Sequence, residues 1–368
     1  MSSSLTHAPE KTARRWEHNS SAMAKPGQAS DILPAQLVRH DFIRTMTESL
    51  PQSVTVQTGA RLHFGPLAYR PQRGRQFGGI GMMVHDPGTR LTISRNRRSG
   101  DGEGQVSDCL NRILEVHPEW SRPDSVCLEA RIPSHRGFGS GTQMALALAE
   151  AVAIFNGVSC APLELAHITG RGARSAIGIH GYQQGGFLID AGFHESEQVG
   201  ELAARVPFPE EWRILLLIPR EPAGLHGARE VQTFQDMKPM DEARTGRLCR
   251  IALTELLPAL YGHDFAAFTS AVSEFGILVG EFFERSQGGI FSTETIRTLT
   301  KDRPNLFQSG LVQSSWGPTA AIFARDLDSA EDLQQELRSG TSEEALQIVI
   351  THGLNTGRQI TCEEPTDA

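Results

Sequence analysis

The chain has 368 residues, 39% of them hydrophobic and 21% charged, which is typical of a folded protein rather than a disordered or fibrous one. Its formal net charge of −8 argues against a nucleic-acid backbone as the main partner. The longest uninterrupted apolar runs, such as Ile214–Ile218, fall short of the roughly 20 residues that span a bilayer, so we expect no membrane partner.

Residues 1–51 are rich in Ser, Ala, Pro and charged side chains, so we predict that they form a disordered extension. Arg14, Arg15 and Glu17 interrupt any apolar segment there, which argues against a secretion signal. The five cysteines form no CxxC pair and are typical of free thiols in a reducing compartment. Together these features predict a cytoplasmic location.

Between residues 54 and 155 the apolar pattern changes several times between strand and helix periods. The predicted elements are strands at 54–65, 91–94 and 125–132, a helix at 106–116 and a strongly apolar helix at 142–155. The last helix is apolar on more than one face, so we expect it to be buried. A glycine-rich turn over residues 135–141 precedes it.

The second half of the chain also mixes strands and helices. The predicted elements are a helix at 162–171, strands at 187–190 and 214–218, helices at 244–260 and 265–283, a strand at 319–323, a helix at 329–337 and a strand at 346–351. We place a domain boundary near residues 205–212. The sequence therefore predicts two domains, 52–207 and 208–362.

Positive charge is concentrated in one part of this acidic chain. Between Arg61 and Arg98 there are eight arginines and one acidic residue, Asp86. This excess suits a small polyanion. A solvated, arginine-rich hairpin explains the same pattern, and the sequence leaves both interpretations open.

The turn before the helix at 142–155 has the features of a phosphate-binding loop. Its backbone N–H groups and the positive end of the helix dipole point at one place, and closely spaced glycines let phosphate oxygens approach. The candidate phosphate-binding residues here are Gly137, Gly139, Ser140, Gly141, Thr142 and Gln143. A tight connection explains such a turn equally well. No GxxxxGK[ST] occurs, which excludes P-loop NTPases, and the Rossmann spacing is not met convincingly.

Several strings together resemble a known family. They are GARLHFGPL (59–67), FGGIGM (77–82), HRGFGSGTQMALALA (135–149), RGARSAIGIHGYQQGGFLIDAG (171–192), GLHGAREVQTF (224–234) and QSSWGPTAA (313–321). Their layout is similar to the three motifs of the GHMP small-molecule kinase superfamily. More narrowly, it resembles the beta-ribofuranosylaminobenzene 5'-phosphate synthases, which share that fold but are not kinases.

The resemblance implies a fold and a reaction. The fold is two-domain α+β, with an S5-domain-2-like amino-terminal part, a ferredoxin-like carboxy-terminal part and the site between them. The reaction joins 5-phosphoribosyl 1-diphosphate to 4-aminobenzoate, releases CO2 and pyrophosphate, and opens the biosynthesis of methanopterin-type one-carbon carriers. The resemblance also suggests a homodimer. Pyrophosphate displacement predicts that Mg²⁺ and arginine neutralise the leaving group.

The matched strings supply the remaining candidate residues. For gripping the phosphate and diphosphate groups we expect Arg61, His63, Arg171 and Arg174, with Arg174 also among the catalytic candidates. Asp190 and Glu230 are the other catalytic candidates, because either could hold Mg²⁺ or stabilise the sugar cation; alternatively, each caps a turn. In the third glycine motif we expect Gln313, Ser314, Ser315 and Trp316 to line the site. Phe64, Phe77 and Trp316 could contact the arene ring.

Two rival functions stay open at this point. The first is an ATP-dependent small-molecule kinase on the same scaffold, against which counts the lack of any acidic residue from Ser175 to Gln184, ahead of Gly185 and Gly186. The second is a non-catalytic protein that binds a sugar phosphate without consuming it.

Overall fold

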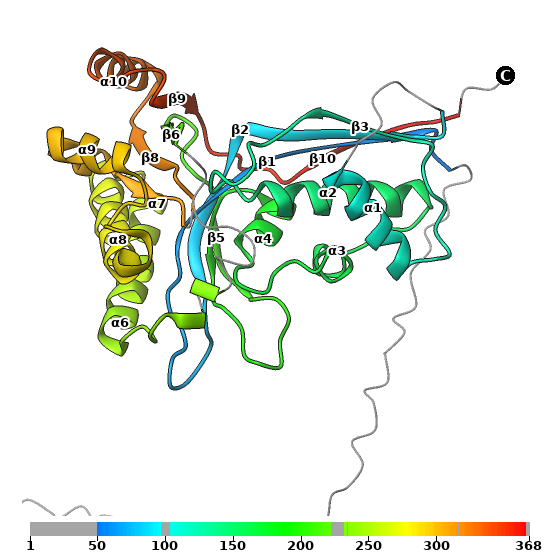
Figure 1. Ribbon diagram of the computed structural model, residues 1–368, viewed down its shortest axis with the longest axis horizontal. Helices are drawn as coiled ribbons and strands as arrows, with labels where there is room; N and C mark the ends of the chain where they lie inside the picture. The colour runs from blue at the N-terminus through cyan, green and yellow to red at the C-terminus, as the bar shows by residue number, and fades with distance from the viewer. Residues whose placement is uncertain (1–49, 97–103, 222–231, 234, 316, 366–368) are drawn as a thin grey trace, which may run out of the picture. The chain divides into compact units, whose positions relative to one another are not determined.

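The computed structural model describes residues 50–96, 104–221, 232–233, 235–315 and 317–365 (Figure 1). The predicted extension up to residue 49 and the candidates Glu230 and Trp316 lie outside these described residues. The described residues all belong to one compact unit. Its described part contains two antiparallel sheets flanked by helices, which confirms the predicted α+β class.

The first sheet holds the longest strands of the described chain. Its members are β1 (Ser53–Gly65), β2 (Gly79–Ser94), β3 (Ser125–Ala130), β4 (Phe187–Asp190), β5 (Leu202–Val206) and β10 (Gln359–Glu363). The strand order is β10-β1-β2-β4-β5, with β3 also paired to β2, and every pair is antiparallel. β1 buries Val54, Val56 and Leu62, as its apolar alternation predicts.

Four helices cover one face of this sheet (Figure 1). They are α1 (Gln105–Val116), α2 (Ser140–Phe155), α3 (Pro162–Thr169) and α4 (Ile177–Gln184). α2 is buried along nearly its whole length, including Leu146, Leu148 and Val152, which confirms the expectation from its all-round apolar sequence. Packing therefore holds the central helix of this layer from Gln143 onward, whereas its first residues, Ser140 to Thr142, are half-buried.

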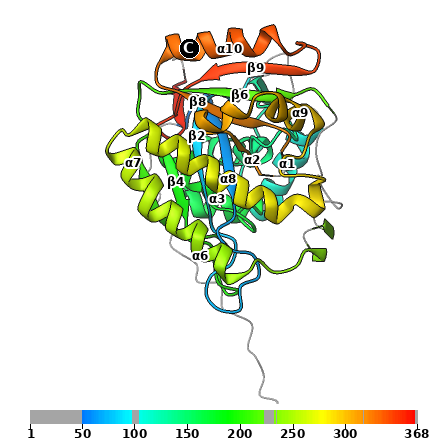
Figure 2. The same cartoon turned by 90° about the vertical axis from the view of Figure 1, so that its left-hand side faces the viewer.

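The second sheet has the order β7-β8-β6-β9. Its strands are β6 (Arg213–Pro219), β7 (Val312–Gln313), β8 (Ala320–Ala324) and β9 (Leu346–Thr351). The helices of this half are α6 (Glu242–Ile251), a π-helical turn η1 (Ala252–Leu256), α7 (Leu257–Tyr261), α8 (Phe265–Gln287), α9 (Glu294–Asp302), a 3-10 turn η2 (Pro304–Ser309) and α10 (Leu327–Ser339). Figure 2 shows α6, α7 and α8 on the side facing the viewer.

Helix α8 packs in the core but is as long and as apolar as a membrane-spanning helix, which the sequence did not lead us to expect. By length and mean hydropathy it is the one helix among the described residues that could cross a bilayer. Its acidic residues Glu274 and Glu281 interrupt every long apolar run, which is why the sequence alone did not single it out. It buries Phe268, Val272 and Phe275 in the largest apolar cluster, together with side chains of both sheets.

The element predictions failed where residues are glycine-rich or polar. β2 runs from residue 79, far ahead of the predicted strand at 91–94, and α4, β5, α9 and β10 were not predicted. The helix predicted at 244–260 is divided by the π-helical turn. The two-domain division at residue 207 stays a prediction. Strand β10 lies at the end of the predicted second domain by sequence, but it forms the edge of the first sheet beside β1.

Candidate functional site

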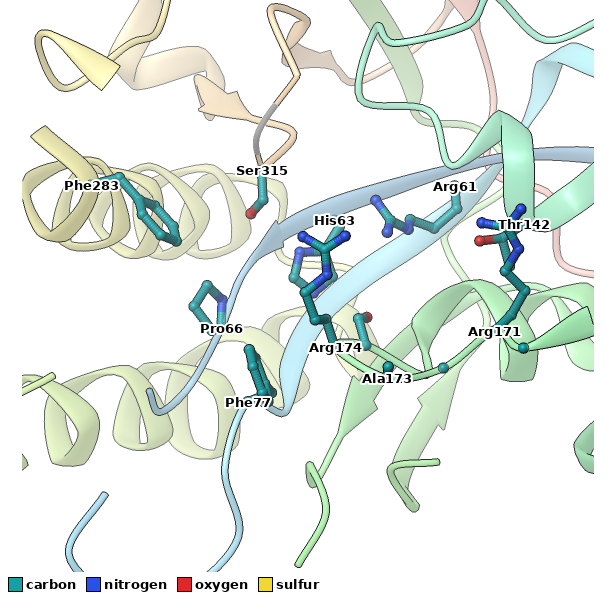
Figure 3. Close-up of a pocket in the computed structure, with 13 residues that line it drawn as sticks. Arg61, His63, Pro66, Phe77, Thr142, Arg171, Ala173, Arg174, Phe283 and Ser315 are labelled. Carbon is teal, nitrogen blue, oxygen red and sulfur yellow. The ribbon is translucent and has the colours of Figure 1, made fainter. Parts of the chain in front are cut away.

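A cavity of about 220 Å³ lies between β1, the start of α2, the loop before α4 and the end of α8 (Figure 3). Its lining includes Arg61, His63, Thr142, Arg171, Arg174, Ser175 and Ser315 together with Pro66, Phe77 and Phe283, and the backbone of residues 170–173. No carboxylate is among these described lining residues. The cavity thus combines cationic, hydroxyl and aromatic groups.

One end of the cavity is cationic because two arginines flank the first turn of α2. Gly139, the residue before the helix, has φ +67, in the left-handed region that favours glycine. A Cβ atom at Gly139 would lie 3.4 Å from Nε of Arg61, and one at Gly141 would lie 3.6 Å from a terminal nitrogen of Arg171. The guanidinium groups add to the positive end of the helix dipole, so this end favours an anion.

Three buried polar atoms of the cavity wall have no hydrogen-bond partner among the described residues: Nε2 of His63, Nε of Arg171 and Oγ of Ser315. Burial lowers the pKa of His63 well below its usual value, and the charge of Arg61 lowers it further, so the imidazole is neutral. Buried polar atoms normally have partners. A polar ligand in the cavity would supply them.

The third glycine motif packs directly against the glycine-rich turn. Oγ of Ser314 donates a 2.6 Å hydrogen bond to the carbonyl of Gly137 and accepts a 3.2 Å bond from the backbone N–H of His63. The backbone N–H of Ser315 donates to the carbonyl of His63 at 2.6 Å. A Cβ atom at Gly137 would lie 2.9 Å from Cα of Gly317. Ser314 therefore joins the turn to β1, and Ser315 faces the cavity.

Asp190 does not line the cavity, which corrects the expectation that its carboxylate handles metal or the sugar cation. Its side chain is 1% exposed, and its two oxygens accept hydrogen bonds from the backbone N–H groups of Ala176 at 2.6 Å and Gly192 at 2.8 Å. Burial is the main cause of its raised pKa. Asp190 instead fixes the start of α4, next to the loop that carries Arg171 and Arg174.

Three further candidates also point elsewhere. Gln143 is fully buried; it accepts from Oγ1 of Thr58 at 2.9 Å and donates to the carbonyl of Gly178 at 2.8 Å. Oε1 of Gln313 accepts a 2.7 Å hydrogen bond from the backbone N–H of Ser292. Ser140 lines a separate, smaller pocket. Gln143 and Gln313 thus bind neighbouring protein groups, and none of the three residues lines this cavity. Their roles in ligand binding stay predictions.

The other end of the cavity is aromatic, and the sequence predicted only one of its residues. Phe77, expected near the ring, lines it together with Pro66 and Phe283, which the sequence analysis did not single out. Phe64, the other aromatic candidate in the described chain, is buried in the core against Phe187 and Phe323. Pro66 lies within the GARLHFGPL string (59–67) and could have been found from it, whereas no local signal marks Phe283 in α8.

The arginine-rich stretch does not act as one anion site. Of its described arginines only Arg61 lines the cavity. Three of the others hold the surrounding structure: Arg75 pairs with Glu197 at 2.6 Å, Arg90 with Glu129 at 2.6 Å, and Arg95 donates to the carbonyls of Pro51 and Phe155. Charge density along the chain therefore overstated the charge at the site, because only Arg61 of these described arginines reaches the cavity, while acids distant in the sequence pair with Arg75 and Arg90.

The described cavity residues do not fit a magnesium site. Mg²⁺ prefers carboxylate, phosphate and water oxygens in octahedral geometry. The described wall offers three hydroxyls, from Thr142, Ser175 and Ser315, among cationic arginines. Within the described ranges no group of three or more His, Cys, Asp or Glu residues could hold a metal ion.

Comparisons with known proteins agree with this fold. Residues 106–188, which contain the glycine-rich turn and α2, match the model of the GHMP kinase N-terminal domain. The chain is 29% identical over 330 residues to a beta-ribofuranosylphenol 5'-phosphate synthase from Methanothermobacter thermautotrophicus, covering 82% of this chain and 97% of that protein.

Solved structures show the same fold at low identity. A homoserine kinase from Cytophaga hutchinsonii matches with a TM-score of 0.57 and 14% identity, over 86% of this chain and 99% of the kinase. A structure of the protein abbreviated MDDEF, in complex with MVAPP, AMPPCP and magnesium, matches with a TM-score of 0.58 and 14% identity, over 84% and 99% of the two chains. The predicted GHMP-kinase-like fold is thus confirmed, and magnesium occurs in one protein of this fold.

Proposed function

Because the chain belongs to the family of beta-ribofuranosylphenol 5'-phosphate synthases, we propose that it joins 5-phosphoribosyl 1-diphosphate to 4-aminobenzoate, with release of CO2 and pyrophosphate. It is then a decarboxylating pentosyltransferase whose product begins the biosynthesis of methanopterin-type one-carbon carriers. The observation that carries the proposal is the cavity wall, where Arg61 and Arg171 flank the N-terminus of α2, Arg174 adds a further guanidinium, and no carboxylate is among the described lining residues.

The cationic end suits a reaction that expels pyrophosphate. Negative charge grows on the leaving oxygen as its bond to the sugar breaks, and fixed positive groups stabilise that charge most in a site sheltered from water. Arg171 and Arg61 flank the first turn of α2, where its free N–H groups also point. These residues bind the diphosphate and lower the barrier to its departure.

The proposed reaction requires no base on the protein, because no proton has to leave the ring. The ring carbon that carries the carboxylate forms a bond to C1 of the ribose, while the bond from C1 to the diphosphate oxygen breaks. The para amine donates electron density into the ring during this attack. The bond from the ring to the carboxylate then breaks, its electron pair restores aromaticity and CO2 leaves. Neutral His63, beside Arg61, can donate or accept a hydrogen bond at Nε2 without carrying charge.

We propose no step through Mg²⁺, because the described residues offer no carboxylate to hold it. A magnesium ion that arrives bound to the diphosphate would meet hydroxyls rather than a protein cage. A homodimer and a cytoplasmic location likewise stay predictions from the sequence.

The name of the Methanothermobacter thermautotrophicus relative favours a second arene. It specifies a ribofuranosylphenol, so the ring in that protein's product carries a hydroxyl. A para hydroxyl activates the ring by electron donation, as a para amine does. We therefore propose 4-hydroxybenzoate as the alternative acceptor for this chain.

The test uses the full chain, 5-phosphoribosyl 1-diphosphate and carboxyl-labelled 4-aminobenzoate or 4-hydroxybenzoate, with and without Mg²⁺. Labelled CO2 that requires both substrates, with stoichiometric pyrophosphate, supports the synthase and identifies the better arene. ATP turnover with an alcohol acceptor and no CO2 would support a kinase instead. Tight binding of 5-phosphoribosyl 1-diphosphate without turnover would support a non-catalytic binding protein.

A further inference from the structure

We infer that the end of the cavity formed by Pro66, Phe77 and Phe283 is the subsite for the arene ring, and that it selects the ring rather than its para substituent. This inference rests on the proposed function. It adds the orientation of both substrates: the ring lies at the aromatic end, C1 of the ribose in the middle, and the diphosphate at the start of α2.

The two ends of the cavity are separated in space. Figure 3 shows Pro66, Phe77 and Phe283 grouped on one side, with Arg61, Thr142 and Arg171 on the other. His63, Arg174 and Ser315 lie between the two groups in the same view. The ring of a substituted benzoate would lose its contact with water among the apolar side chains, whereas a diphosphate would be stabilised only at the opposite end.

The backbone of Phe77 supports a ligand-facing role for its ring. Its φ is +61, in the left-handed region that is costly for a bulky side chain. The neighbouring Gly78 also has φ +61, and a Cβ atom there would lie 2.8 Å from the carbonyl oxygen of Asp190. A strained aromatic residue persists only where the surrounding structure holds it, and such residues cluster at ligand sites.

Neighbouring aromatic rings hold Phe77 in place from behind. Its ring stacks on Phe193 with centroids 5.4 Å apart, and Tyr69 meets it edge-on at 5.7 Å. Across the cavity, Phe283 is 3% exposed and lies on the buried face of α8. Both cavity-facing rings are therefore fixed before any substrate arrives, which favours stacking with a flat aromatic ligand.

The stereochemistry of the displacement requires the same order of groups. 5-Phosphoribosyl 1-diphosphate carries its diphosphate on the α face of the sugar, and a beta-ribofuranosyl product has the new bond on the opposite face. A single displacement with inversion therefore places the attacking ring and the leaving diphosphate on opposite sides of C1. The aromatic and cationic ends of the cavity stand in this relation to the residues between them (Figure 3).

The test compares Phe77→Leu and Phe283→Leu with a matched control, Phe265→Leu. Phe265 is also on α8 but packs against Trp212, with ring centroids 5.1 Å apart, and does not line the cavity. Each cavity variant should raise the KM for 4-aminobenzoate about tenfold, as expected for lost apolar contact in a pocket. The KM for 5-phosphoribosyl 1-diphosphate and the Kd for inorganic pyrophosphate should stay within about twofold of the wild type.

Both arene acids serve as probes in the same experiment. If Phe77 and Phe283 contact the ring, each variant should raise the KM for 4-aminobenzoate and the KM for 4-hydroxybenzoate by the same factor. Factors that differ by more than about tenfold would overturn selection of the ring over its substituent. Unchanged KM for both acids in both variants, with normal pyrophosphate binding, would overturn the subsite while the synthase function stands.

A wild-type protein without turnover would instead overturn the proposed function, and binding then decides the subsite. 4-Aminobenzoate is titrated against wild type and variants in the presence of pyrophosphate, with thermal melting as the check on folding. Binding that Phe77→Leu or Phe283→Leu weakens supports an aromatic-acid subsite without the synthase reaction. No binding to the wild type overturns the subsite as well.

Discussion

The two ends of the cavity differ in how the chain builds them. The cationic end comes from short stretches that are contiguous with recognisable motifs: Arg61 on β1, Arg171 before α4 and the turn before α2. The aromatic end brings together residues from three places in the chain. Pro66 directly follows β1, Phe77 precedes β2, and Phe283 lies late in α8. Only the packing of α8 against the first sheet makes that end.

This difference predicts that substitutions at the two ends affect different kinds of binding. At the cationic end, glycines allow guanidinium groups to approach a helix N-terminus, so substitutions that change charge or backbone freedom should act on anion binding. At the aromatic end, rings are held by other rings, so substitutions should act on ring contact. The predictions below test the first end and its link to the third glycine motif, in order of decreasing effect.

Arg171→Met should produce the largest change. Loss of the half-buried guanidinium beside the start of α2 should weaken pyrophosphate binding about a hundredfold, close to 3 kcal/mol. The melting temperature of the unliganded protein should not fall, because removal of a desolvated charge is neutral or stabilising. Titration calorimetry measures the binding, with Arg112→Met, which removes an exposed arginine of α1, as the control. Equal affinities in both variants would place the diphosphate elsewhere.

Gly137→Ala should destabilise the contact between the turn and the third motif. Gly137 has φ +89, and the added Cβ would meet Cα of Gly317 at 2.9 Å. We expect a loss of about 2 kcal/mol of unfolding free energy, with lower activity. Gly74→Ala is the matched control, since Gly74 has φ +86 but nothing within 4 Å of the added atom. A loss of about 1 kcal/mol is expected there; equal losses would show that strain alone, without the contact, explains both.

The sequence predicted the parts of the site that local chemistry determines. Glycine spacing before an apolar helix identified the turn, and that turn does adopt the left-handed geometry at Gly137 and Gly139. The fate of each polar side chain depends on distant partners, which a single sequence does not show. Asp190 meets the N–H of Ala176, and Gln143 meets Thr58 and Gly178, so both turn away from the cavity.

Two neighbouring serines should separate stability from binding. Ser314→Ala removes the hydrogen bonds to Gly137 and His63 and should cost about 1 kcal/mol of unfolding free energy. Ser315→Ala removes a buried hydroxyl that has no partner among the described residues, so it should not lower stability. It should instead weaken binding of 5-phosphoribosyl 1-diphosphate about threefold, as for one lost hydrogen bond. Chemical denaturation and calorimetry on both variants check this, and an exchange of the two effects would contradict the assigned orientations.

His63→Gln should give the smallest effect, visible only in the pH dependence of stability. Burial, and then Arg61, lower the pKa of His63 in the folded protein well below its ordinary value of 6.5. Below that ordinary value the unfolded chain binds a proton that the folded chain does not, so stability rises with pH across this window and is lost on acidification. The variant should therefore show a shallower loss of stability as pH falls from about 7 to about 5. Denaturation at several pH values measures the slopes, with exposed His194→Gln as the control. Equal slopes in the two variants would mean that His63 takes up a proton on the folded protein as readily as in the unfolded chain, and the neutral imidazole beside Arg61 would have to be abandoned.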